Sequence, residues 1–167
     1  MPPEAAGPLW YQRCVSTPYR SCYFTHKQRS YHYLEWGNPN HPGILCIHGA
    51  LANAYWYCAL APFLHENFCV RSLSLAGHGL SDWHPQYNCH GMLEVIDAAC
   101  RLSPCHFIIG HSLGARLALT YAQTYSHLLQ GVVLLDPPFG PHIGLSSRKP
   151  ATQTPTKVTH THRIAAD

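Results

Sequence analysis

The segment Phe107–Ala115 reads Phe-Ile-Ile-Gly-His-Ser-Leu-Gly-Ala and restricts the possible folds more than any other part of the sequence. It contains the pattern G-x-S-x-G between an apolar strand-like run and an apolar helix-like run, the context in which this pattern forms a sharp strand-to-helix turn. Such a turn presses together the residues two before and two after the serine, so Gly110 and Gly114 suit it. The turn would raise the Ser112 hydroxyl above the sheet, beside a helix N-terminus that favours developing negative charge. A glycine-rich turn in which Ser112 only caps the helix is the alternative interpretation.

Strand-like and helix-like patterns alternate around this segment. The first pair of candidate strands, Arg20–Thr25 and Ser30–Trp36, is separated by a short segment with the polar run Lys27-Gln28-Arg29 and predicts a hairpin. Four wholly or largely apolar strands follow, and three helical faces lie between them. The strands are 44–47, 68–75, 107–109 and 132–135, and the helical faces fall within 56–64, 92–100 and 113–124. Strands that are apolar on both faces and alternate with helices predict an α/β fold with a mostly parallel sheet, covered by helices on both faces.

Two further glycine motifs follow the first two of these strands. His48-Gly49-Ala50 comes directly after strand 44–47, and a backbone N–H of this loop could join that of Leu113 as the two donors of an oxyanion hole. A plain turn at Gly49 is the alternative. After strand 68–75, Gly77 and Gly79 permit a tight loop; because the loop lacks the lysine and the glycine spacing of a phosphate-binding loop, we interpret it as structural.

These motifs together resemble the α/β-hydrolase superfamily, in its epoxide-hydrolase-like and carbon–carbon-hydrolase-like branch. The resemblance covers about residues 30–140, on His48-Gly49, Gly77-His-Gly-x-Ser81, the Gly110–Gly114 motif and Leu134-Leu-Asp136. It implies that Ser112 is the nucleophile and that Ala50 and Leu113 supply the oxyanion N–H groups. It also implies structural roles for His48 and His78. The motifs are specific for the fold but not for the substrate.

The acid of a catalytic triad is less sharply indicated. Asp136 ends the strand that follows the helix of Ser112, where some members of the superfamily carry the acid and others carry it one strand later. The alternative is that Asp136 only caps the turn before Pro137-Pro138. Asp82 and Asp97 are weaker candidates, more consistent with a loop position and an exposed helix position.

The triad histidine has no recognisable position. In the superfamily it follows the last strand, after a lid and two further strands, and the sequence stops before these. His142, His160 and His162 follow Ser112, but none comes after a strand, and we interpret them as solvated tail residues. His160 and His162 lack a third metal ligand, so no metal and no cofactor is predicted. The expected fold is therefore an α/β-hydrolase fold that lacks the lid and the last two strands and is C-terminally incomplete.

These observations predict three segments and leave three interpretations of function open. We expect a loose leader at 1–18, the N-terminal part of a hydrolase core at 19–139, and a flexible tail or the start of a lid connection at 140–167. The first hypothesis is a serine hydrolase for an ester, thioester or related carbonyl substrate that is inactive as this short chain. The alternatives are a non-catalytic module that binds a small ligand and a non-functional truncated product.

Composition limits the partners and the compartment. Charged residues are only 11% and the net charge is +3 without a basic cluster, so no nucleic-acid partner is indicated. No apolar run reaches membrane-spanning length and no signal peptide is visible, and the eight cysteines form no C-x-x-C pair, which favours free thiols in a cytoplasmic setting. The apolar run Val132–Leu135 would be an exposed sheet edge, and we expect self-association through it.

Overall fold

The computed structural model describes residues 7–85, 87–138 and, for the backbone only, 163–164. The strands are β1 Arg20–His26, β2 Arg29–Trp36, β3 Gly43–Ile47, β4 Cys69–Leu73, β5 Cys105–His111, β6 Gly131–Leu135 and β7 Arg163–Ile164. The α-helices are α1 Leu9–Ser16, α2 Cys89–Cys100 and α3 Leu113–Tyr125, and the 3-10 helices are η1 Ala54–Tyr57, η2 Ala61–Phe63 and η3 Ser126–Leu128. None of these described helices is long and apolar enough to cross a membrane.

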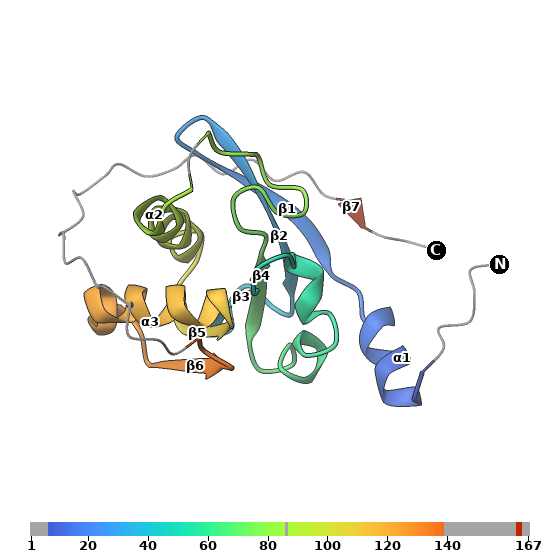
Figure 1. Cartoon of the computed structure of the whole chain (residues 1–167). Coiled ribbons are helices and arrows are strands. Elements are labelled where there is room, and N and C mark those ends of the chain that lie inside the picture. The colour runs from blue at the N-terminus through green and yellow to red at the C-terminus, as the bar shows by residue number, and fades with distance from the viewer. Residues whose placement is uncertain (1–6, 86, 139–162, 165–167) are drawn as a thin grey trace.

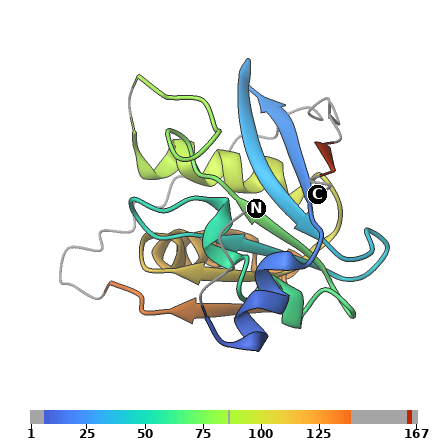
Figure 2. The same ribbon diagram turned by 90° about the vertical axis from the view of Figure 1, so that its right-hand side faces the viewer.

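The strands form one mixed sheet in the order β6-β5-β3-β4-β2-β1-β7. Strands β3, β4, β5 and β6 run parallel to one another, whereas β2 pairs antiparallel with both β1 and β4. Figure 2 shows β6 and the long β1–β2 hairpin at opposite sides of the sheet. The predicted hairpin and the predicted parallel α/β core are therefore confirmed. Because parallel strands all point the same way, the turns after β3, β4, β5 and β6 meet at one edge.

The core is divided by the sheet into two layers. On one face α2 and α3 lie side by side (Figure 1) and bury an apolar cluster that includes Ile96, Leu117 and Tyr121. On the other face η1 and η2 cover a second cluster that includes Trp36 and Tyr57. The burial of both faces explains why β3 and β4 have no exposed residue along their whole length.

The segment 56–64 differs from the prediction of a single amphipathic helix. It forms η1 and η2, two 3-10 turns, and Trp56 and Phe63 are exposed rather than buried. Asn53 accepts a hydrogen bond from the Tyr55 amide at the start of η1, and Pro62 lies at the start of η2. Proline lacks the N–H that an α-helix through this point would need, so the segment breaks into two short turns.

Both segments that were predicted to be without regular structure, 1–18 and 140–167, contain a helix or a strand. Within the leader that was expected to be loose, α1 forms and its Trp10 ring packs 6.4 Å from the ring of Phe63. Two residues of the expected tail, Arg163 and Ile164, pair antiparallel with β1 as strand β7. The rest of that tail, with His142, His160 and His162, lies outside the described residues.

Candidate active site

Ser112 lies on a sharp turn between β5 and α3, as the sequence predicted. Its backbone angles, φ 49° and ψ −112°, are outside the regions that L-residues normally occupy. A Cβ atom on Gly110 would lie 2.4 Å from the carbonyl oxygen of Gly114, and a Cβ on Gly114 would lie 2.1 Å from that of Ile47. Both positions therefore require glycine, because backbone atoms occupy the space that a side chain would need.

Backbone hydrogen bonds hold this turn between β6 and α3. The Ser112 N–H donates to the carbonyl oxygen of Leu135 (2.9 Å), and the Arg116 N–H donates to the carbonyl oxygen of Ser112 (3.1 Å). Ser112 is the N-terminal cap residue of α3, and among the described residues no side chain makes a capping hydrogen bond to this helix. The hydroxyl is thus attached next to a helix N-terminus, where the free N–H groups stabilise negative charge.

The loop after β3 lies directly against this turn. A Cβ atom on Gly49 would lie 3.2 Å from the Cβ of Ser112 and 2.8 Å from Nδ1 of His111. The next residue, Ala50, is exposed, and the described residues offer no hydrogen-bond acceptor to the Ala50 or Leu113 amide. Two free N–H groups beside a serine side chain are the arrangement that an oxyanion hole requires.

His48 is fully buried and connects this loop to the end of β4. Its Nε2 accepts the Leu75 N–H (3.0 Å), so its Nδ1 carries the proton and donates to the Gly49 carbonyl oxygen (2.7 Å). Burial lowers the pKa of His48 to about 4. The ring of His78 packs against it at 5.1 Å. Both histidines lie between the ends of β3 and β4, and the structural roles that the resemblance implies for them stay a prediction.

The loop after β4 is held by hydrogen bonds within the protein, in line with its interpretation as structural. Gly77 and Gly79 have positive φ angles of 71° and 55°, which glycine adopts without strain. The Ser81 hydroxyl donates to the Ser74 carbonyl oxygen (2.7 Å) and accepts the His32 N–H (3.0 Å). These bonds fold the loop back onto β2.

Asp136 lies where the chain leaves β6, one residue after the carbonyl that Ser112 binds. It is exposed and has a positive φ of 47°, and no hydrogen bond engages its carboxylate among the described residues. The carboxylates of Asp82 and Asp97 accept hydrogen bonds from other parts of the protein. Asp82 accepts the Ser30 N–H (2.7 Å), and Asp97 accepts from Arg101 (2.8 Å) and Tyr121 (3.1 Å). Of the three acids, Asp136 is therefore the one close to Ser112 in the fold and free of other contacts.

His111 is a neighbour of Ser112 that the sequence reasoning did not single out. Its ring stacks on Trp56 at 5.0 Å, and its buried Nδ1 has no hydrogen-bond partner among the described residues. Its place inside the G-x-S-x-G motif was visible, but the stacking partner comes from η1, far away in sequence. No imidazole hydrogen-bonds the Ser112 hydroxyl in the segments 7–85 and 87–138. In the same segments no cluster of three His, Cys, Asp or Glu side chains suits a metal ion.

Comparison with known proteins places this arrangement in a class. A family model described as the alpha/beta hydrolase fold matches residues 42–154. The chain belongs to the α/β hydrolase family, which confirms both the predicted fold and the resemblance.

Individual relatives are similar over between three fifths and three quarters of the chain. A serine hydrolase-like protein of Mus musculus is 33% identical over 60% of this chain and 34% of its own length. An N-formylmaleamate deformylase of Pseudomonas putida is 34% identical over 64% of this chain and 41% of its own. The solved structure of an E-2-(acetamidomethylene)succinate hydrolase superposes with a TM-score of 0.67 at 30% identity, covering 74% of this chain and 46% of that one. The matched region spans between a third and a half of these relatives' own lengths.

Proposed function

We propose that this protein is the part of a serine hydrolase that carries the nucleophile and the oxyanion hole, and that its substrate is an ester, thioester or related carbonyl compound. The observation that carries the proposal is the strained turn at Ser112, packed against the loop after β3. Relatives named as an N-formylmaleamate deformylase and a 2-(acetamidomethylene)succinate hydrolase agree with carbonyl hydrolysis. Several cysteines are buried as free thiols, which favours a reducing compartment, and we propose the cytoplasm.

The reaction would begin with attack of the Ser112 hydroxyl oxygen on the substrate carbonyl carbon. The N–H groups of Ala50 and Leu113 would bind the negative charge that develops on the carbonyl oxygen. Loss of the leaving group would give an acyl-enzyme, and water would release the acid. Asp136 would serve as the acid that orients a histidine base.

The base is the component that the described residues do not supply. Without an imidazole to remove its proton, a serine hydroxyl is a weak nucleophile, and loss of one triad member removes most of the activity. We therefore expect the isolated chain to hydrolyse p-nitrophenyl acetate at less than about 1 s⁻¹, below the ordinary enzyme range.

Acylation of Ser112 tests the proposal without requiring turnover. The protein is incubated with p-nitrophenyl acetate, with and without added imidazole, and the acetylated residue is mapped by mass spectrometry. The proposal predicts one acetyl group on Ser112, formed faster when imidazole supplies the base. Ser112→Ala should abolish the adduct. Ser126→Ala, which changes an exposed serine of η3, is the matched control and should leave it.

Two outcomes would change the proposal. If Ser112 is not acetylated under either condition, the nucleophile assignment is wrong and the small-ligand-binding module becomes the better hypothesis. If turnover exceeds about 1 s⁻¹ and is lost in Ser112→Ala, the chain contains its own base, and our expectation of an inactive short chain is wrong.

A further inference from the structure

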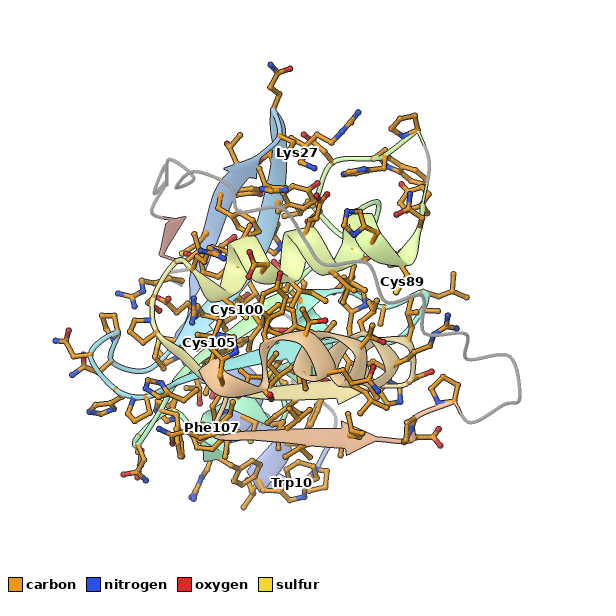
Figure 3. All side chains as sticks on the ribbon, turned by 90° about the vertical axis from the view of Figure 1, so that its left-hand side faces the viewer. Trp10, Lys27, Cys89, Cys100, Cys105 and Phe107 are labelled. Carbon is orange, nitrogen blue, oxygen red and sulfur yellow. The ribbon has the colours of Figure 1, made fainter. Side chains whose placement is uncertain are left out.

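The corner where α2 turns into β5 brings together two cysteines and a buried arginine that the proposed hydrolysis does not use. Helix α2 ends at Cys100 and β5 begins at Cys105. Figure 3 shows these two side chains next to each other, with Cys89 at the far end of α2. Ser112 follows the opposite end of β5, so this corner is separate from the candidate active site.

Arg71, on β4, joins the two sides of this corner from within the core. Its side chain is 1% exposed, and its guanidinium donates to the carbonyl oxygens of Ala99 (2.9 Å) and Ser103 (3.1 Å). Its Nε has no partner in the described part of the chain, and no carboxylate there forms an ion pair with it. Glu35 lies opposite it in the sheet but pairs with Arg20. A guanidinium buried without a paired anion stabilises a negative charge that forms nearby.

The two thiols at this corner are not equivalent. A hydrogen bond from the Cys100 thiol lowers the pKa of Cys105, and the positive charge of Arg71 lowers it further against the effect of burial. The same hydrogen bond, together with burial, raises the pKa of Cys100. Cys105 is therefore the more acidic of the two thiols. One reactive thiolate next to a second thiol is the arrangement found in cysteines that oxidise reversibly.

We propose that Cys100 and Cys105 form a redox-active dithiol, which a hydroperoxide converts into a reversible disulfide between α2 and β5. The Cys105 thiolate attacks one oxygen of hydrogen peroxide and breaks the O–O bond, giving a sulfenic acid and hydroxide. The Cys100 sulfur then attacks the Cys105 sulfur, and its proton leaves with the sulfenic oxygen as water. Two electrons pass from the sulfurs to the peroxide, and an added dithiol returns them when it reduces the bond.

Peptide mapping tests this pairing in the folded protein. The sequence allows a clean assignment, because trypsin cleaves after Arg101, between the two cysteines. In a Cys89→Ser variant the tryptic peptide 72–101 contains Cys100 alone, and peptide 102–116 contains Cys105 alone. The variant is treated with one equivalent of hydrogen peroxide, unfolded in N-ethylmaleimide, digested without reductant and mapped.

The expected product is one disulfide linking these two peptides, removed by dithiothreitol before alkylation. With Cys100 also changed to serine, Cys105 should accumulate as a sulfenic acid that dimedone traps. With Cys105 changed to serine, Cys100 should remain unoxidised. In the wild-type chain Cys89, which is exposed and lies at the other end of α2, should still be alkylated after the same treatment.

Three results would overturn the proposal. One is a disulfide from Cys105 to Cys46, the buried thiol of β3 whose pKa the charge of Cys105 raises. Another is oxidation of Cys89 before Cys105 in the wild-type chain. The third is the absence of any linked peptide when peroxide is in large excess. All three are read from singly substituted or wild-type protein, so they do not depend on whether the double variants fold.

Discussion

Strands β3 and β6 have nearly the same kind of sequence and very different surroundings. Each is five residues long, begins with glycine and continues with four apolar residues, Gly-Ile-Leu-Cys-Ile and Gly-Val-Val-Leu-Leu. Strand β3 pairs with β4 and β5 and is buried throughout, whereas β6 pairs only with β5 among the described strands. Val133 and Leu135 of β6 are 49% and 38% exposed. An apolar run therefore makes a buried central strand possible, but its place in the sheet decides whether it is buried.

The same difference divides the candidate active site. The loop after β3 carries Gly49 and Ala50, and His48 fastens it to β4 through two hydrogen bonds. The residue after β6 is Asp136, which is exposed and makes no such contact within the described residues. The loop that we propose as part of the oxyanion hole is thus fastened to the core, while the proposed acid follows a strand that is partly exposed.

A large difference between the two strands should appear at one glycine that packs on β3 and one that begins β6. Gly114→Ala places a Cβ atom 2.1 Å from the carbonyl oxygen of Ile47 on β3 and should lower the free energy of unfolding by about 3 kcal/mol. Gly131→Ala, at the start of β6, meets only the Phe107 ring at 3.3 Å and should cost less than about 1 kcal/mol. Urea denaturation measures both. Equal losses would mean that β6 is packed as tightly as β3.

A second pair of substitutions compares leucines within the strands. Leu45→Ala in β3 removes a buried side chain from the core and should lower the free energy of unfolding by about 2–5 kcal/mol. Leu135→Ala in β6 removes a side chain that already contacts solvent and should cost less than about 1 kcal/mol. A loss above about 2 kcal/mol for Leu135→Ala would show that another segment covers β6.

The pH dependence of stability should depend on the buried histidine after β3. In the unfolded chain His48 binds a proton near its ordinary pKa of 6.5. In the folded protein burial lowers the pKa of His48 to about 4. The unfolded state then holds more protons between these values, so stability is complete above pH 6.5 and falls as the pH drops toward 4. The slope is up to about 1.4 kcal/mol per pH unit for each such group, and His32 adds a second one, since burial lowers its pKa to about 4 as well.

Urea denaturation of two variants between pH 4 and pH 7 isolates this effect. His48→Gln should reduce the slope, even if the variant is less stable throughout. His127→Gln changes an exposed histidine in η3, next to β6, and should leave the slope unchanged. If both variants keep the wild-type slope, His48 does not control the acid sensitivity.

We expect the smallest effect on stability from Val133→Lys. The same substitution is the most direct test of whether β6 acts as an exposed sheet edge. An apolar edge strand offers unpaired N–H and C=O groups to another chain, and we expect this chain to self-associate there. The lysine should weaken the association while changing the free energy of unfolding by less than about 0.5 kcal/mol. Val133→Thr keeps the β-branched shape without charge and is the matched control. Size-exclusion chromatography with light scattering measures the mass; a monomeric wild-type chain at tens of micromolar would contradict this hypothesis.

The strand-turn-helix unit at Ser112 and the parallel core could be predicted because their causes are local. Two glycines at a spacing of four residues, an apolar strand before and an apolar helix after already define the turn. The segment 56–64 could not be predicted in the same way. Its apolar spacing fits an α-helix, but Pro62 and the contacts of η1 with β2, β3 and β4 favour two 3-10 turns. Helix α1 escaped prediction because its contacts, such as Trp10 with Phe63, are distant in sequence.

Local sequence patterns are enough to predict the family of the fold, the order of its motifs and the residue at the sharp turn, since steric limits on glycine and the period of apolar residues act within a few positions. The three-dimensional arrangement was needed to show that β3 is buried and β6 is partly exposed, that His48 holds the loop beside Ser112, and that Arg71 lies near Cys100 and Cys105. Burial and charge at a position depend on which strands become neighbours, and strand order brings together residues that no short stretch of sequence contains.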